Sequence, residues 1–200
     1  MERYITLSLV LLLAAAICAS AAAPTAATKS VPRTSAFIRS SCRATRYPQI
    51  CERCLATYVP PVHRSPRGVA AAALSVSADK ARSVSAYVSR MSAKAPSARS
   101  RESGAVRDCL ETMRDSVDRL RRSVHEMGRM GRARSPRFAW HLSNVQTWVS
   151  AALTDESTCL DSLSQNAGPA VRAAIRKRVE EVAQVTSNAL ALVNRLGTRM

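Results

Sequence analysis

Apolar residues recur at spacings of three and four along four long stretches of the chain, which is the periodicity of amphipathic α-helices. Glycine and proline interrupt the pattern between the stretches, which span approximately 67–94, 103–127, 137–164 and 169–196. In the second stretch the apolar stripe consists of Val106, Leu110, Met113, Val117, Leu120 and Val124. No stretch shows the alternating pattern that is typical of strands. The sequence therefore predicts an all-α fold, and the short connections favour an antiparallel up-down-up-down four-helix bundle.

Two of the long stretches begin with a serine followed by a proline, at Ser65-Pro66 and Ser135-Pro136. A serine hydroxyl at a helix start accepts a hydrogen bond from a backbone N–H that has no helical partner, and proline suits the first helical position. We therefore expect the two serines to cap the first and third long helices.

A shorter helical segment, residues 35–58, precedes the long stretches and is interrupted by Pro48. Because the residue before a proline is driven out of the helical conformation, Tyr47-Pro48 predicts a corner between two short helices. Cys42 and Cys51 lie on either side of this corner. A disulfide between them would close a short loop and stabilise an N-terminal helical hairpin by about 2–3 kcal/mol in the loop-entropy model.

The N-terminus has the layout of a secretory signal peptide. Arg3 precedes an apolar run from Ile5 to Ile17, and small residues suited to signal peptidase follow. The run is shorter than the roughly 20 residues that a membrane-spanning helix needs. We therefore expect residues 1–23 to be a signal peptide, residues 24–34 a loose leader and residues 35–200 one secreted helical domain.

The chain has six cysteines, and removal of the signal peptide takes Cys18 and leaves five. An odd number of cysteines in an oxidising compartment predicts two disulfides and one remaining thiol. The count alone leaves the connectivity open, because any cysteine can be the odd one. The proline corner favours a bridge within the hairpin, and the assignment that follows is Cys42–Cys51, Cys109–Cys159 and, outside both disulfides, Cys54.

The formal net charge is +16, and the signal peptide contributes nothing to it because it contains one Arg and one Glu. Such a basic balance is typical of proteins that meet polyanions. Aromatic residues make up only 4% of the chain, which argues against a surface that stacks nucleic-acid bases. We therefore expect no nucleic-acid partner, and the polyanions that a secreted chain meets are wall polysaccharides, anionic lipid and acidic proteins. Two cysteine pairs and a full apolar core favour a rigid globular domain, so no membrane partner is expected after signal removal.

Residues that could carry catalysis or bind a metal are scattered. His63, His125 and His141 occur in no recognisable nucleophile or ligand pattern, and no Gly-x-Ser-x-Gly motif is present. Cys51 and Cys54 have the spacing of redox and zinc sites, but no strand–helix–strand context or further ligands accompany them. The sequence therefore predicts a protein that is not an enzyme and that has no metal site and no cofactor.

Four motifs occur in order along the mature chain: SCRATRYPQIC at 41–51, DCLETMRDSVDRL at 108–120, NVQTWVSAALTDESTC at 144–159 and TSNALAL at 186–192. Together they resemble the plant invertase and pectin methylesterase inhibitor domain. The resemblance implies a four-helix bundle with an N-terminal helical hairpin. It also implies that the first two and the last two family cysteines are bridged, with a fifth outside the bridges. Members of the family are inhibitors rather than enzymes.

An acidic cluster on the second long stretch is the strongest candidate for a binding site. Glu111, Asp115 and Asp118 are spaced i, i+4 and i+7, so they lie within about 60° of one another and away from the apolar stripe. Three like charges so close together repel one another, and in so basic a chain arginines between them would have removed this repulsion. The clustering of the acids therefore favours a functional role. The resemblance implies that these positions contact the target enzyme, and it implies the same for Thr158 and Asp161.

The resemblance implies an apoplastic inhibitor of pectin methylesterase, which would form a 1:1 complex, cover the substrate cleft and limit pectin de-esterification in the cell wall. The alternative target is cell-wall or vacuolar acid invertase, because some invertase inhibitors have Pro-Lys-Phe where this chain has Pro136-Arg137-Phe138. Retention by anionic pectin is expected of the surface arginines, which are predicted to be Arg114, Arg119, Arg121, Arg122, Arg129, Arg132, Arg134 and Arg137.

Overall fold

The structure, a computed structural model, describes residues 31–56, 65–93 and 100–198. The chain divides into two compact units, Met1–Val31 and Pro32–Met200, and all the contacts given below lie within the second. The expected signal peptide at 1–23 and most of the expected leader at 24–34 lie outside the described residues. None of the described helices combines the length and the hydrophobicity that crossing a membrane requires.

The described residues form six helices and no strands. The two short helices are α2 (Val31–Cys42) and α3 (Pro48–Ala56), and the four long ones are α4 (Pro66–Ala93), α5 (Arg101–Arg129), α6 (Pro136–Asn166) and α7 (Pro169–Gly197). The all-α prediction is confirmed, and each long helix matches its expected range to within a few residues. The first short helix begins at Val31, earlier than the expected boundary at Ser35.

Serine side chains cap the starts of three long helices. Ser135 Oγ accepts a hydrogen bond from the Phe138 N–H at 3.1 Å, and Ser65 Oγ accepts one from the Gly68 N–H at 3.1 Å. Ser100 Oγ likewise accepts from the Ser103 N–H at 3.1 Å at the start of α5. Each hydroxyl satisfies a backbone donor that has no partner within its helix, so these residues fix where the helices begin.

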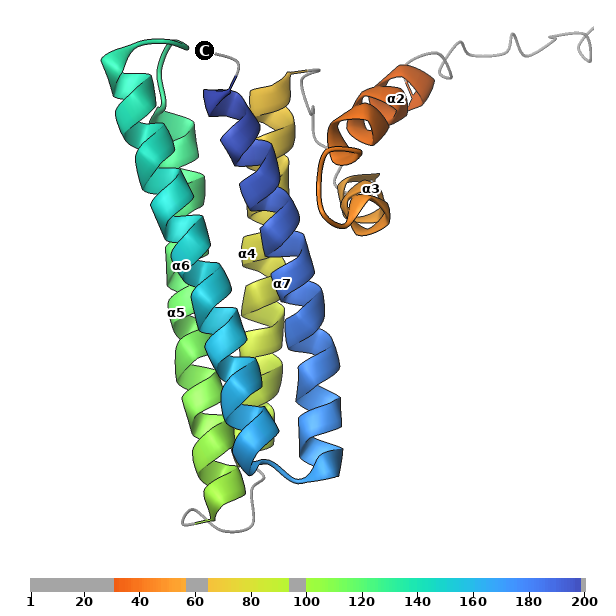
Figure 1. Ribbon diagram of the computed structural model, residues 1–200, viewed down its shortest axis with the longest axis vertical. Helices are drawn as coiled ribbons and strands as arrows, with labels where there is room; N and C mark the ends of the chain where they lie inside the picture. Colours follow the sequence, from red (N-terminus) through yellow and green to blue (C-terminus); the bar gives the residue numbers. More distant parts are fainter. Residues whose placement is uncertain (1–30, 57–64, 94–99, 199–200) are drawn as a thin grey trace, which may run out of the picture. The chain divides into compact units, whose positions relative to one another are not determined.

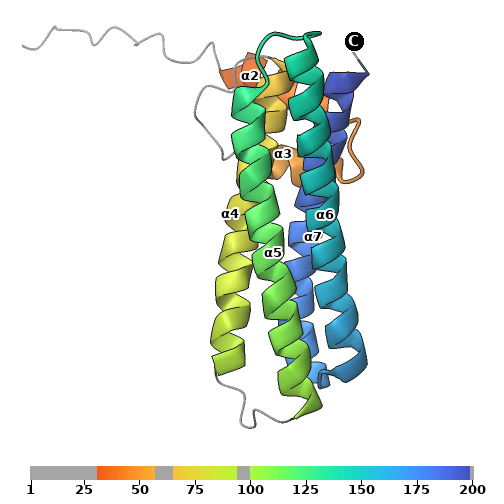
Figure 2. The ribbon, with the colours of Figure 1, turned by 90° about the vertical axis from the view of Figure 1, so that its left-hand side faces the viewer.

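The four long helices lie side by side (Figure 1). Helices α5 and α6 contact each other, as do α4 and α7, and the contacts of α4 with α5 and of α6 with α7 join the two pairs. Figure 2 shows α5 and α6 in front of α4 and α7. The outer surface of the α5–α6 pair therefore faces away from the α4–α7 pair.

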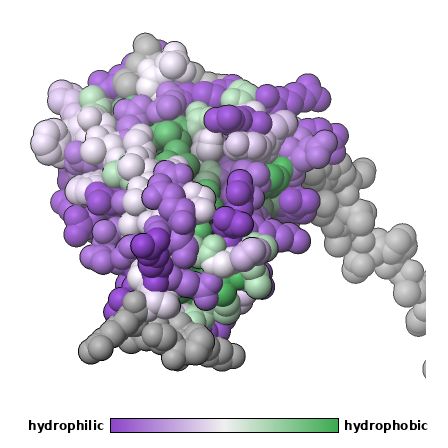
Figure 3. Space-filling model, turned by 60° about the horizontal axis from the view of Figure 1, so that its bottom comes forward, coloured by the Kyte–Doolittle hydropathy of each residue, from purple (hydrophilic) through white to green (hydrophobic). Residues whose placement is uncertain are grey.

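The predicted apolar stripes form the core between these helices. On α5 the buried stripe residues are Val106, Leu110, Met113, Val117 and Leu120, while Val124 is half-buried. On α7 the core residues include Ile175, Val182, Val185, Leu192 and Leu196. Burial of each large aliphatic side chain contributes about 1.5–3 kcal/mol, which is the main term that holds the helices together. Figure 3 shows that hydrophilic residues cover most of one end, with only small hydrophobic patches.

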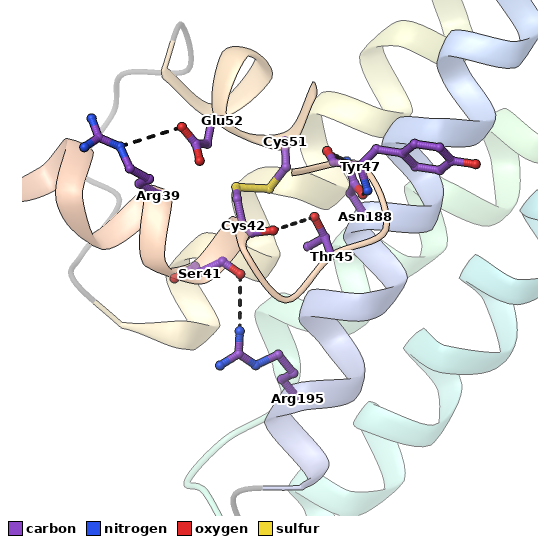
Figure 4. The surroundings of a disulfide bond; sticks show 9 residues. All are labelled: Arg39, Ser41, Cys42, Thr45, Tyr47, Cys51, Glu52, Asn188 and Arg195. Atoms are coloured by element: carbon purple, nitrogen blue, oxygen red, sulfur yellow. Dashed lines mark hydrogen bonds and ion pairs between the residues drawn. A yellow bond between two sulfur atoms is a disulfide. The ribbon is translucent and has the colours of Figure 1, made fainter. Parts of the chain in front are cut away.

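The corner between α2 and α3 is fastened to α7 by the side chain of Asn188 (Figure 4). Asn188 Oδ1 accepts a hydrogen bond from the Tyr47 N–H at 3.0 Å, and Asn188 Nδ2 donates one to the Tyr47 carbonyl at 2.9 Å. Nearby, Arg195 Nη1 donates to the Ser41 carbonyl at 3.2 Å. The corner left non-helical by Pro48 therefore has its backbone groups satisfied by a buried amide.

Candidate functional site

Two disulfides occur in the described part of the chain. Cys42 and Cys51 are bonded across the α2–α3 corner, and Cys109 on α5 is bonded to Cys159 on α6. Cys109 and Cys159 are fully buried. Because the second bond joins two neighbouring long helices, it limits their sliding and rotation relative to each other. The side chains on the outer surface around it are consequently held at fixed relative positions.

The five residues expected to bind a target enzyme all lie on these two helices. We call their surface the α5–α6 face, and it consists of Glu111, Asp115, Asp118, Thr158 and Asp161. All five side chains are exposed. Among the described residues, no ion pair involves any of the four carboxylates. Their negative charges are therefore available to a partner.

A partly buried ion pair joins the two helices beside this face. Arg119 Nε donates to Asp155 Oδ2 at 2.7 Å, and the Asp155 side chain is only 13% exposed. Burial raises the pKa of Asp155, the bond from Arg119 lowers it, and the negative charge of Asp115 raises it again. Arg119, expected among the pectin-binding arginines, thus has its guanidinium engaged by a neighbouring helix.

Toward the C-terminal end of α5, beyond the α5–α6 face, further side-chain contacts join α5 and α6. The guanidinium of Arg122 lies over the Trp148 ring, 5.1 Å from the centroid, which is a cation–π contact. Beyond it, His141 Nδ1 lies 2.6 Å from Glu126 Oε2, and Asn144 Nδ2 donates to the same oxygen at 3.1 Å. The hydrogen bond from His141, followed by that from Asn144, lowers the pKa of Glu126. These contacts join α5 to α6 in addition to the disulfide and the Arg119–Asp155 ion pair.

Sequence reasoning missed a carboxyl group in the core. Glu156 on α6 is fully buried, and its Oε1 accepts hydrogen bonds from Ser116 Oγ at 2.8 Å and Thr186 Oγ1 at 3.0 Å. Its Oε2 has no hydrogen-bond partner among the residues that the structure describes. Burial raises the pKa of Glu156 to about 8, against the effect of the two hydroxyls. The group therefore carries a proton at neutral pH and links α5, α6 and α7 without a charge.

A signal for Glu156 was present in the spacing of the chain. Ala152, Glu156, Cys159 and Leu163 recur at intervals of four and three, and all of them are buried. Its neighbours in the run Thr-Asp-Glu-Ser are polar, so the local composition gives no indication that the glutamate is buried. Helical spacing from the disulfide cysteine indicates the core-facing side.

The Cys51-x-x-Cys54 spacing does not produce a dithiol, because Cys51 is bonded to Cys42. Cys54 takes part in neither disulfide, and burial raises the pKa of its thiol. In the part of the chain that the structure describes, no group of three His, Cys, Asp or Glu side chains could hold a metal ion. His63 lies outside the described residues.

Comparison with known proteins gives a consistent result. The family model described as plant invertase/pectin methylesterase inhibitor matches residues 36–192. Pectinesterase inhibitor 9 of Arabidopsis thaliana is 45% identical over 100% of this chain and 97% of its own length. Pectinesterase inhibitor 11 of the same plant is 42% identical over 96% of each chain, and a 21 kDa protein of Daucus carota is 40% identical over 82% of this chain and 84% of its own.

Solved structures agree at the level of the fold. A crystal structure of mutant form A of a pectin methylesterase inhibitor from Arabidopsis superposes with a TM-score of 0.60 at 17% identity, over 78% of this chain and 95% of that one. The resemblance stated from the four motifs is therefore confirmed. By its family match, its relatives and its fold, the chain belongs to the plant invertase/pectin methylesterase inhibitor family.

Proposed function

We propose that this protein inhibits pectin methylesterase and is not itself an enzyme. The observation that carries the proposal is the α5–α6 face, where four exposed carboxylates, without ion pairs to any described residue, stand on two helices joined by a disulfide. The names of relatives such as pectinesterase inhibitors 9 and 11 support the choice of target. A rigid, preformed surface loses little conformational entropy on binding, which favours a tight protein–protein complex.

The mechanism proposed is occlusion of the substrate cleft in a 1:1 complex. The carboxylates of Glu111, Asp115 and Asp118 pair with basic groups around the cleft, which guides the encounter and fixes the orientation. Thr158 and Asp161 extend the contact onto α6. Because the ties between α5 and α6 are internal to the inhibitor, binding needs no rearrangement of these helices.

The architecture we propose is the antiparallel up-down-up-down four-helix bundle with the helical hairpin at its N-terminal end. It is supported by contacts between every pair of consecutive long helices and by the contact of α4 with α7, which closes the ring. The connections between α5 and α6 and between α6 and α7 are too short for a crossover to the opposite end.

We further propose that residues 1–23 direct the chain to the apoplast, that residues 24–34 are a leader, and that residues 35–200 are the inhibitor domain. Disulfide bonds within the domain support an oxidising, extracellular location. The surplus of arginine supports a salt-sensitive association with anionic pectin in the wall.

Acid invertase is the second candidate target, and one observation favours it. Arg137 is exposed in the first turn of α6 beside Pro136, so the Pro136-Arg137-Phe138 tripeptide presents a cation at the end of the domain. The purified mature protein, added to each enzyme in turn, separates the two targets. We expect stoichiometric loss of pectin methylesterase activity and unchanged invertase activity; the opposite result would reject the proposal.

A further inference from the structure

A groove runs between α4 and α7, on the pair of helices that lies behind the α5–α6 face in Figure 2. Its volume is about 310 Å³, and its polar lining comprises Lys80, Ser83, Tyr87 and Arg90 from α4 with Arg178 and Glu181 from α7. We call it the α4–α7 groove. None of these residues belongs to the α5–α6 face, so an occupant of the groove and an enzyme on that face would not compete for the same side chains.

The centre of the groove is a tyrosine flanked by two guanidinium groups. Arg178 lies over the Tyr87 ring at 4.1 Å from the centroid, and Arg90 lies 6.0 Å from the same centroid. Stacking on the aromatic ring restrains the plane of a guanidinium while its N–H groups remain able to donate at the edge. The geometry suits a planar carboxylate, which accepts two parallel hydrogen bonds from one guanidinium.

The charges in the groove leave these two arginines uncompensated. Lys80 Nζ donates to Glu181 Oε1 at 2.7 Å, so those two charges offset each other. Among the described residues, neither Arg90 nor Arg178 forms an ion pair with an acid. The pKa of Glu181 is lowered by the bond from Lys80, against burial, which raises it, and then by the positive charges of Lys80, Arg53 and Lys177. The surroundings of Glu181 are therefore positive.

We propose that the α4–α7 groove binds a chain of uronic acid sugars, with the carboxylates held by Arg90 and Arg178. An open groove between two helices accommodates a polymer, whereas a compact anion would need a more enclosed site. The exposed Ser83 hydroxyl and the Tyr87 hydroxyl supply partners for sugar hydroxyls. The shortage of aromatic residues argues against nucleic acid as the polyanion.

The choice of galacturonic acid as the sugar depends on the proposed function. Pectin methylesterase removes methyl esters and leaves free carboxylates on its polymer, so its product has the groups that the groove recognises and its substrate lacks them. An inhibitor that holds the product would accumulate where the enzyme has already acted. Tethering to the polymer raises the local concentration of inhibitor around the enzyme.

Isothermal titration with an oligogalacturonate, near physiological ionic strength, tests the proposal. The variant Arg90→Ala/Arg178→Ala removes the two groove cations, and Arg114→Ala/Arg121→Ala removes two exposed arginines of α5 that lie outside the groove. Both variants lose the same net charge. We expect about tenfold weaker binding for the groove variant and less than about twofold for the control, with no heat from the fully methyl-esterified oligomer.

Equal losses in the two variants would overturn the proposal, because diffuse charge attraction would then account for the binding. Equal affinity for the esterified oligomer would overturn it as well. Pectin methylesterase inhibition by the groove variant is measured in parallel and is expected to remain at the level of the unmodified protein. If the protein binds the oligomer through Arg90 and Arg178 but inhibits no pectin methylesterase, the proposed function fails while the uronate site stands.

Discussion

Arg119 on α5 and Asp155 on α6 form an ion pair of 2.7 Å between the same two helices that the Cys109–Cys159 disulfide joins. The disulfide and this ion pair therefore both act on the α5–α6 pair, in addition to the contacts of Glu126 with His141 and Asn144. The acids of the α5–α6 face stand on these helices, so their relative positions depend on these links.

Replacing Cys109 and Cys159 by serine is expected to lower the free energy of unfolding by about 4 kcal/mol in the loop-entropy model, since the bond closes a separation of 50 residues. Removing Cys42 and Cys51 opens a separation of only 9 residues, so about 2–3 kcal/mol is expected there. Urea unfolding of the two double variants measures the difference. A smaller loss from the long loop than from the short one would contradict the prediction.

The variant Arg119→Ala leaves the largely buried Asp155 carboxylate without its cation. We expect a loss of about 1–3 kcal/mol in unfolding free energy, because a desolvated charge then has no partner. Arg121→Ala is the matched control, since Arg121 is exposed on the same helix and surface changes of this kind stay within about 0.5 kcal/mol. Equal stabilities of the two variants would show that the ion pair contributes nothing.

Because the pKa of Glu156 is raised in the folded state, we expect this group to make the protein less stable as the pH rises. Its pKa is about 8 in the folded state, against 4.5 as the ordinary value, so the folded chain binds the proton more tightly than the unfolded chain does. The contribution of this group is complete below pH 4.5 and is lost as the pH rises toward 8, with a slope of up to about 1.4 kcal/mol per pH unit.

Glu156→Gln keeps the shape of the side chain and removes its titration. Urea unfolding at several pH values should therefore give a flatter stability profile for the glutamine variant across this window. Glu180→Gln, at a solvated position on α7, should retain the slope of the unmodified protein. A glutamine variant with an unchanged slope would mean that Glu156 does not titrate in the manner described.

Asn188→Ala should release the α2–α3 corner from α7. The substitution removes both hydrogen bonds to the Tyr47 backbone, and we expect a loss of about 2 kcal/mol together with faster hydrogen exchange at the Tyr47 amide. Asn194→Ala, on the same helix, is the control, because the Asn194 side chain is exposed and its Oδ1 accepts a hydrogen bond from Gln146 Nε2 on α6, away from the corner. If the Tyr47 amide stays equally protected from hydrogen exchange in Asn188→Ala, the Asn188 side chain does not hold the corner.

The sequence predicted the elements whose signals are local. Helical spacing, the Ser65 and Ser135 caps and the Pro48 corner each depend on neighbouring residues, and the helix boundaries in the structure follow them closely. The exposure of Glu111, Asp115 and Asp118 follows in the same way, because it depends only on their angle from the apolar stripe of their own helix.

Contacts between distant residues could not be predicted from spacing. Asn188 reaches the Tyr47 backbone across 141 positions, and Glu156 depends on hydroxyls from α5 and α7. A periodic pattern indicates which side of a helix is inward, but it does not indicate which inward polar groups meet. The ion pair of Arg119 is a further example, because its partner Asp155 lies on another helix.

If the acids of the α5–α6 face bind the target enzyme, two variants that lose the same number of negative charges should differ in the strength of their inhibition. One variant combines Glu111→Gln, Asp115→Asn and Asp118→Asn. The control neutralises three acids outside the face, Glu52, Asp79 and Glu180, whose partly exposed side chains on α3, α4 and α7 pair with Arg39, Arg82 and Arg176. We expect inhibition of pectin methylesterase to be at least about tenfold weaker for the first variant and nearly unchanged for the control. Equal inhibition by both variants would contradict this expectation.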